Sequence, residues 1–441
     1  MKYSRFFTVS ILAMTLLLLV GGVAAQDKVS IRYWLWDTNQ LPPYQECANN
    51  FMAENPGIEV LVEQLGWGDY WTGITTGFVS GDSPDVFTNH LAKYPEFVVL
   101  GQIYDIQPWV ERDGVPTDIY YPGLAELWTK DGGRYGLPKD WDTVAVVYNA
   151  DMLEAAGIDP AIFDTWTWNY EDGGEFEQVI AQLTLDVNGN NALSPDFDKS
   201  NIAVYGFGNN GAGGPYGQTE WSMFTNTTGW VHNNGTWGDE YYYDDERFIN
   251  TIQWLSDLSL VKGYAPPYAD QTGLGRFSLL QAGKTAMGID GSWMIGSYLS
   301  SEFEVGFARL PAGPEGRKSM FNGLADSIYI GTPHPEESWA WVKYLGSEAC
   351  QTVVGQSGVV FPAIPSAAEL SLQVRAEAGI DVSAFTDQAA EEGGTFLFPI
   401  TDFGGEINTI MSETMDKILL GQGTAADLLP VANEEVNSLF E

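Results

Sequence analysis

The region after the N-terminal apolar segment alternates between strand and helix patterns, and this alternation constrains the fold most. Residues 29–35 alternate apolar and polar or aromatic side chains, the two-residue period of a half-buried strand. Pro42-Pro43 opens a helix that ends near residues 55–57, and a second strand follows at 58–62. This strand–helix–strand opening predicts an open α/β sheet, whose ligands bind beyond the carboxyl ends of its strands.

The predicted carboxyl ends carry aromatic and polar side chains. Trp36 and Asp37 follow the first strand, and Trp67 follows the second. A third strand is expected around residues 85–87, with His90 after it. Each tryptophan fits a core position as well as a ligand contact, and His90 fits an ordinary loop residue. A further β-rich segment is expected at 143–148, after a turn-like Gly136-Leu137-Pro138.

Length and charge limit the classes of function. A chain of 441 residues exceeds what one hydrophobic core usually serves, so two domains are expected. The formal net charge of -39 repels phosphate backbones and anionic membranes, which argues against nucleic-acid binding. It argues more weakly against strongly anionic ligands, because an acidic surface also serves solubility alone.

The N-terminus has the pattern of a secretory signal peptide. Lys2 and Arg5 precede an apolar stretch at 11–20 and small residues before Gln26. Cleavage is expected after Ala25. The alternative is a membrane anchor, but the stretch is short for a span, which needs about 20 apolar residues. With no cysteine near the junction to carry a lipid, the sequence predicts an exported protein, periplasmic or extracellular.

The chain has two cysteines, Cys47 and Cys350. Cys47 lies on the apolar face of the first predicted helix, which suits a buried thiol. A disulfide between the two is equally compatible with an exported protein. The sequence leaves both states open.

Five segments, in the same order along the chain, resemble the family 1 extracellular solute-binding proteins, the sugar-capturing components of bacterial ABC importers. One of them, Gly136-Leu137-Pro138 followed by Tyr148-Asn149-Ala150-Asp151, resembles the block that crosses the hinge in that family. The five segments are residues 51–60, 80–86, 135–153, 279–293 and 322–350.

The resemblance implies an α/β architecture, the two-lobed periplasmic-binding-protein fold of type II, with each lobe built from discontinuous segments. It implies a monomer that closes on a carbohydrate and presents it to the transmembrane subunits of an ABC importer, with no catalysis and no required cofactor. The implied boundaries are 26–140 and 320–370 for lobe one, 142–318 and 375–441 for lobe two, and a hinge near 138–143, 316–322 and 370–375.

A neutral sugar needs bidentate polar partners for its hydroxyls and aromatic faces for its C–H groups. In the resemblance, Asp142 aligns with a sugar-contacting acid of the maltose-binding relatives, and Trp293 with a stacking position of the second lobe. The acids near the hinge fit helix caps or a surface pair as the alternative. The full set of expected ligand contacts is Trp36, Asp37, Trp67, His90, Asp140, Trp141, Asp142, Tyr216, Trp221, Trp230, Asp290, Trp293, Asn322 and Gly323.

One loop has the spacing of a calcium site. Asp186, Asn188 and Asn190 occupy the first, third and fifth positions, with Asp196 and Asp198 as later ligands. The usual glycine and the closing glutamate of such a loop are missing. The alternative is a plain turn rich in Asn and Asp.

Two other functions remain open from the residues. An extracellular glycoside hydrolase also needs acids and tryptophans in a cleft. A cationic solute could be held by an aromatic cage with acidic residues. The Gly283-Lys284-Thr285 run lacks the upstream glycine of a phosphate-binding loop, so it predicts no nucleotide site.

Overall fold

The first sheet forms from the strands that the sequence pattern predicts. In this computed structural model, which describes residues 28–441, β1 pairs in parallel with β2 and β3. Alternate residues Ile31, Tyr33 and Leu35 are buried, as the two-residue period requires. The strand order is β2 (Ile58–Gln64), β1 (Val29–Leu35), β3 (Val86–Asn89), β14 (Ala325–Ile328) and β6 (Leu137–Pro138).

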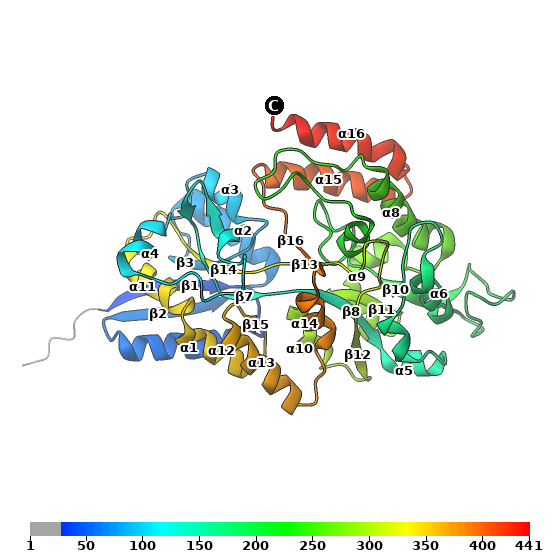
Figure 1. Cartoon of the computed structure of the whole chain (residues 1–441), viewed down its shortest axis with the longest axis horizontal. Coiled ribbons are helices and arrows are strands. Elements are labelled where there is room, and N and C mark those ends of the chain that lie inside the picture. The colour runs from blue at the N-terminus through cyan, green and yellow to red at the C-terminus, as the bar shows by residue number, and fades with distance from the viewer. Residues whose placement is uncertain (1–27) are drawn as a thin grey trace, which may run out of the picture.

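Helices cover this first sheet and complete lobe one (Figure 1). A disulfide joins Cys47 of α1 to Cys350 of α12, which settles the alternative that the sequence left open. The helices are α1 (Leu41–Glu54), α2 (Trp67–Ser80), α3 (Tyr94–Val99), α4 (Gln107–Asp113), α11 (Pro335–Leu345), α12 (Glu348–Ser357) and α13 (Pro365–Glu377).

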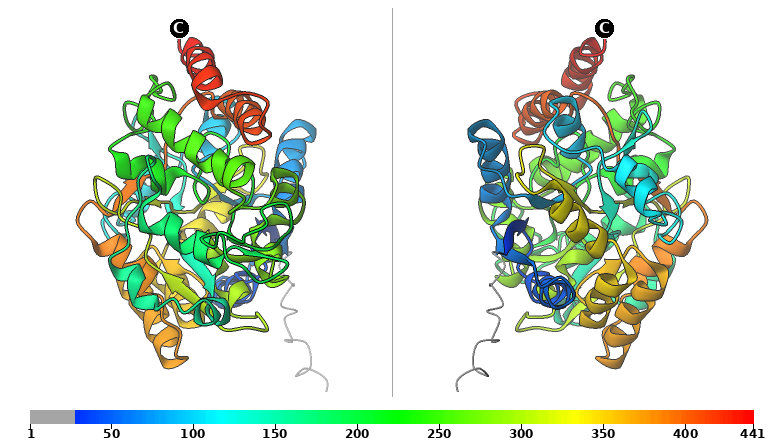
Figure 2. Two further views of the ribbon diagram at one scale, coloured as in Figure 1. Left: turned by 90° about the vertical axis from the view of Figure 1, so that its right-hand side faces the viewer. Right: turned by 90° about the vertical axis from the view of Figure 1, so that its left-hand side faces the viewer.

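The second lobe surrounds a mixed sheet in the order β12 (Val305–Ala308), β8 (Val144–Asn149), β11 (Thr285–Gly291), β10 (Ile202–Gly208) and β9 (Leu185–Asp186). Every residue of β8 and β11 is buried, because helices cover both faces. Figure 2 shows α15 and α16 together at one end of the molecule. The helices are α5 (Ala150–Ala155), α6 (Gly174–Leu183), α7 (Ser222–Thr225), α8 (Glu246–Asp257), α9 (Tyr268–Gln281), α10 (Ile295–Tyr298), α15 (Gly404–Leu419) and α16 (Ala425–Ser438).

The chain crosses between the lobes more than once. Asp142 and Asn322 lie on neighbouring crossings and exchange backbone hydrogen bonds of 2.9 and 3.2 Å. The expected boundary at 370–375 falls within the continuous helix α13, so the last crossing follows that helix. The crossing elements are β7 (Asp140–Trp141), β13 (Ser319–Phe321), β15 (Phe361–Pro362), α14 (Ser383–Ala390) and β16 (Thr395–Leu397).

Two further predictions concern the edge strand of the first sheet and the N-terminal segment of the chain. The segment Gly136-Leu137-Pro138 was expected to form a turn before the strand at 143–148, but Leu137 and Pro138 form the edge strand β6 beside β14. An edge tolerates proline because one side of the strand needs no N–H donor. The predicted signal peptide and its cleavage site after Ala25 lie outside the described residues. Among residues 28–441, no helix is long and apolar enough to cross a membrane.

Candidate functional site

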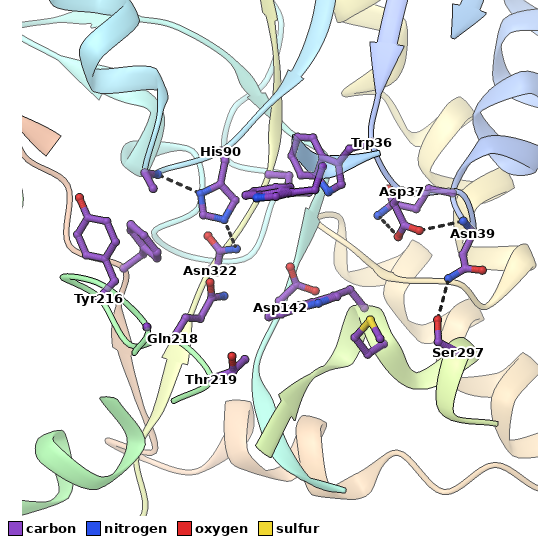
Figure 3. A pocket seen from close by; sticks show the side chains of 18 of the residues that line it. Trp36, Asp37, Asn39, His90, Asp142, Tyr216, Gln218, Thr219, Ser297 and Asn322 are labelled. Carbon is purple, nitrogen blue, oxygen red and sulfur yellow. Dashed lines mark hydrogen bonds between the residues drawn. The ribbon is translucent and has the colours of Figure 1, made fainter. Parts of the chain in front are cut away.

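A cavity of about 760 Å³ lies between the two lobes, where the crossing strands meet (Figure 3). This volume falls within the range of about 300–1,000 Å³ that is typical of small-molecule sites. Its walls come from loops after β1, β2 and β3 in the first lobe and from loops around β10 and β11 in the second. The open-sheet rule places a ligand at this position.

Tryptophans form the first lobe's wall. The Trp36 ring meets Trp67 edge-on at 5.1 Å and lies 5.2 Å from Tyr70. Trp67 stands at the start of α2 and remains 51% exposed, although most large aromatic side chains in this chain are buried. An exposed ring at the mouth of a cavity offers a flat apolar face to a ligand.

His90 and Asn322 meet on the cavity floor. His90 Nδ1 accepts from the backbone N–H of Ala92 at 3.0 Å, and Nε2 lies 3.3 Å from the Asn322 amide. Desolvation, and then the nearby Lys93 charge, lower the pKa of His90 to about 3, so the ring is neutral. Its proton is therefore on Nε2, so the Asn322 side chain accepts this hydrogen bond through its amide oxygen, with the oxygen and nitrogen of the amide exchanged.

Two acids lie side by side at the hinge. Asp142 lines the cavity, and its Oδ1 accepts from Ser292 Oγ at 2.9 Å, while no described residue donates to its Oδ2. Burial, together with the Asp140 charge, raises the pKa of Asp142 well above its ordinary value. Burial also raises the pKa of Asp140 to about 7, although the Lys139 charge opposes it. Asp142 therefore presents an oxygen that needs a hydrogen-bonding partner from the ligand.

The rim of the cavity holds a contact between the lobes. Asp37 accepts from the Asn39 backbone N–H at 2.8 Å and from Gln40 Nε2 at 3.0 Å. Burial raises the pKa of Asp37 against the effect of these bonds. Asn39 Nδ2 reaches Ser297 Oγ of the second lobe at 3.5 Å. Asp37 therefore orients the loop after β1 toward the opposite lobe.

The second lobe adds a mixed wall. Tyr216 lies 4.6 Å from Phe398, ring to ring, and Trp293 follows the end of β11. Glu220 accepts from the Thr219 hydroxyl at 2.7 Å, and burial raises its pKa. The lining holds three carboxyl side chains, and none of its described residues is Lys or Arg.

Eight of the expected contacts lie together on this cavity: Trp36, Asp37, Trp67, His90, Asp142, Tyr216, Trp293 and Asn322. Several other lining residues were not among the expected contacts. Thr38, Asn39 and Gln40 continue the loop after β1, so the open-sheet rule could have included them. Ser297 lies one helical turn after Trp293. No sequence pattern indicated the remaining polar and aromatic lining residues, because their positions depend on long-range packing. These residues are Gln218, Thr219, Glu220 and Phe398.

Six expected contacts do not line the cavity. Trp221 and Trp230 are 0% and 1% exposed and belong to the second lobe's core, where their indoles donate to Ala212 O and Tyr242 O. Trp141 stacks 4.7 Å from Phe361 beneath the hinge. The other three are also buried: Asp290 pairs with Arg276 at 3.0 Å, Asp140 accepts from the Leu324 N–H, and Gly323 packs against Leu124 and Asp140.

The loop with calcium-like spacing uses its acids differently. The Asp186 carboxylate accepts from the backbone N–H groups of Asn188, Asn190 and Asp198 at 2.8–2.9 Å and from the Asn190 amide at 3.0 Å. Asp198 accepts from Ser200 and Asn201, and Asp196 contributes its carbonyl to Asn190. Across residues 28–441, no three His, Cys, Asp or Glu side chains gather as a metal site. These hydrogen bonds are those of an Asn- and Asp-rich turn, and calcium binding by this loop stays a prediction.

Comparisons with known proteins agree with this architecture. A protein of Brucella abortus named as a binding protein is 24% identical over 416 residues, which cover 91% of this chain and 90% of that protein. The arabinooligosaccharide-binding protein of Bacillus subtilis is 20% identical over 358 residues, covering 77% of this chain and 75% of that protein.

A solved structure shows the same two-lobed fold. The ABC substrate-binding protein of Listeria monocytogenes in complex with cycloalternan has a TM-score of 0.80 at 18% identity, covering 94% of this chain and 99% of that chain. The family model described as bacterial extracellular solute-binding protein matches residues 37–352. The chain therefore belongs to the bacterial extracellular solute-binding protein family.

Proposed function

We propose that this protein captures a neutral carbohydrate between its lobes and delivers it to an ABC importer. The observation that carries the proposal is the lining of the interlobe cavity. Partly exposed tryptophan side chains stand beside carboxyl and amide groups, and none of the described lining residues is Lys or Arg. The names of the arabinooligosaccharide-binding relative and of the cycloalternan complex support the same ligand class.

The cavity chemistry suits a polyol. A sugar hydroxyl can form one hydrogen bond with the free oxygen of Asp142 and another with the Asn322 side chain, both of which line the cavity. Its ring face packs on Trp36, Trp67 or Trp293, where C–H groups meet an electron-rich surface. Closure of the lobes removes these groups from water, which strengthens each hydrogen bond.

We extend the proposal to the location of the protein, its oligomeric state and its partner. The mature chain begins at Gln26 in the periplasm or outside the cell, without a lipid anchor at that position. It acts as a monomer, and the closed form docks on the transmembrane subunits of the importer. It binds its ligand without chemical conversion, in keeping with the family and its relatives, which are binding proteins.

A cationic solute is the second candidate, because Asp37, Asp142 and Glu220 all line the cavity. An ammonium group could pair with these carboxyls while the tryptophans enclose it. The two candidates differ in the ligand and share the fold.

A thermal-shift screen separates them. Neutral mono- and oligosaccharides at about 100 times Kd should stabilise the protein by about 2.7 kcal/mol, by mass action. Betaine and polyamines at the same concentrations should leave the melting temperature unchanged. A shift with the cations and none with any sugar would contradict the carbohydrate proposal.

Replacing Trp293 tests whether the second lobe's wall of the cavity contacts the ligand. Trp293→Ala should weaken sugar binding about tenfold or more, because a partly exposed aromatic platform is lost, while the melting temperature changes little. Trp168→Phe is the matched control, because Trp168 is 2% exposed in the second lobe's core and neither it nor its neighbours in sequence line the cavity. It should lower stability and leave the affinity unchanged. Isothermal calorimetry measures both affinities, and equal affinity for Trp293→Ala and wild type would remove that residue from the site.

A further inference from the structure

A loop of the second lobe reaches across to the first lobe through Trp237. This residue lies between the core residues Trp230 and Tyr241 of the second lobe. Its indole Nε1 donates to Thr129 O at 2.9 Å, and its ring lies 5.7 Å from Tyr94, nearly perpendicular to it. Tyr94 and Thr129 belong to the first lobe, so this side chain joins the two bodies directly.

Charged and backbone groups reinforce the contact. Lys130 Nζ stands 4.4 Å above the Trp237 ring and forms an ion pair with Asp402. The Trp237 backbone N–H donates to Ile400 O at 2.8 Å, and the Thr401 hydroxyl lies 3.2 Å from Gly238 O. Three segments therefore meet at one residue: the hairpin of β4 (Thr129–Lys130) and β5 (Gly133–Arg134), the loop around Trp237, and the crossing segment 398–402.

The backbone of Trp237 is strained. Its φ of +58° is in the left-handed region, which bulky side chains rarely occupy. Such a conformation persists only where its surroundings hold it, and here two other segments do so, through hydrogen bonds to Thr129 O and Ile400 O. The sequence Asn234-Gly235-Thr236-Trp237-Gly238 gives flexible neighbours on both sides, and Gly238 N donates back to Gly235 O at 2.9 Å.

The contact lies next to one end of the ligand cavity. Phe398, two residues before Ile400, lines the cavity and stands 4.6 Å from Tyr216 and 5.4 Å from His90. The Trp237 loop thus fixes the segment that forms this end wall. At the rim the lobes meet through the Asn39–Ser297 bond of 3.5 Å, which is long for a hydrogen bond. The two ends of the cavity are therefore held unequally.

We propose that the Trp237 loop is an interlobe latch: it keeps the lobes together at the Phe398 end of the cavity, so that the cleft opens at the Asn39–Ser297 rim. The latch positions the end wall and limits the range of opening. It acts on the ligand-free protein and does not depend on the ligand being a carbohydrate.

Small-angle X-ray scattering of the ligand-free, full-length mature protein tests the latch. Trp237→Gly removes the indole and also relieves the strained φ, so the melting temperature should change little. The radius of gyration should nevertheless shift to a larger value, because the lobes lose their connection. A residue that served stability alone would lower the melting temperature without this shift. Trp109→Phe is the control, because Trp109 stacks on Trp339 within the first lobe.

Two milder variants cover the case in which Trp237→Gly does not fold. Trp237→Phe keeps an aromatic ring and loses the bond to Thr129 O, and Lys130→Met loses the ion pair with Asp402. Each should raise the open-to-closed ratio about fivefold, the equivalent of one hydrogen bond of about 1 kcal/mol. A folded Trp237→Gly protein with the wild-type radius of gyration would overturn the latch. So would wild-type scattering from both milder variants.

Discussion

At the scale of single residues, the hinge shows how burial controls charge. Asp140 is 1% exposed, its Oδ1 accepts from the Leu324 N–H at 3.0 Å, and its Oδ2 is buried without a partner. A carboxylate in this position loses water without full compensation, which raises the pKa of Asp140 to about 7. Its neighbour Asp142, which faces the cavity, experiences the same effect. The hinge therefore carries a stability cost at neutral pH.

Asp140→Asn should remove that cost. Between about pH 4 and 7 the folded protein keeps the Asp140 proton that the unfolded chain has lost, so this group makes the wild type less stable as the pH rises. The variant stays neutral. Its free energy of unfolding relative to wild type should increase across this window and level off above pH 7, about 2–4 kcal/mol higher. Chemical denaturation at several pH values measures the difference.

The control is Asp244→Asn, which removes one negative charge from an exposed position before α8. Its difference from wild type should stay small across the same pH range. A constant difference for Asp140→Asn, without dependence on pH, would contradict the burial argument.

At the scale of elements, the edge strand β6 anchors the hinge to the first sheet. Lys139 directly follows this strand and is 1% exposed. Its Nζ donates to Tyr33 Oη and Thr88 Oγ1 at 2.9 Å each, pairs with Asp326 at 3.4 Å, and stands 3.8 Å above the Tyr44 ring. Strands β1, β3 and β14 and helix α1 thus converge on one ammonium group at the start of the crossing.

Removing one member of the Lys139–Asp326 ion pair should lower the free energy of unfolding. Lys139→Met leaves the Asp326 carboxylate buried without its cation, and the expected loss is about 3–5 kcal/mol of unfolding free energy. Adding Asp326→Asn should recover much of the loss, because the uncompensated charge is gone. Urea denaturation of both variants measures the coupling. A loss below about 1 kcal/mol for Lys139→Met would show that the hinge does not depend on the pair.

At the scale of the whole molecule, one covalent bond closes the first lobe. The Cys47–Cys350 disulfide links residues 303 positions apart and joins α1 to α12 across the two discontinuous segments of that lobe. A bond that closes so long a loop restricts the unfolded chain strongly. The bond also suits an oxidising compartment outside the cytoplasm.

Removing the disulfide should destabilise the protein by about 2–5 kcal/mol. The double variant Cys47→Ala/Cys350→Ala should melt at a lower temperature than wild type, because both side chains are fully buried and the loop constraint is lost. Adding a reductant should lower the melting temperature of the wild type and leave that of the variant unchanged. Equal melting of oxidised wild type and variant would show that packing alone holds the two segments.

The sequence determined the strand–helix alternation and, through it, the first lobe's contribution to the cavity. Trp36, Asp37, Trp67 and His90 lie within three residues of the carboxyl ends of strands, and the order of a parallel sheet brings such positions to one edge. The local sequence pattern alone therefore predicted that these four residues lie at the cavity. The family resemblance added Asp142 and Trp293, which also line the cavity.

Only the tertiary structure decided which aromatic residues of the glycine-rich segment reach the cavity, whether the two cysteines form a disulfide, and where the last crossing lies. Tyr216 lines the cavity while Trp221, five residues later, is in the core. Phe398 joins the wall from far along the chain. These outcomes depend on packing between segments distant in sequence, where one residue type fits either environment. A local pattern carries no information about such contacts, because the energy that selects them arises only when both lobes are assembled.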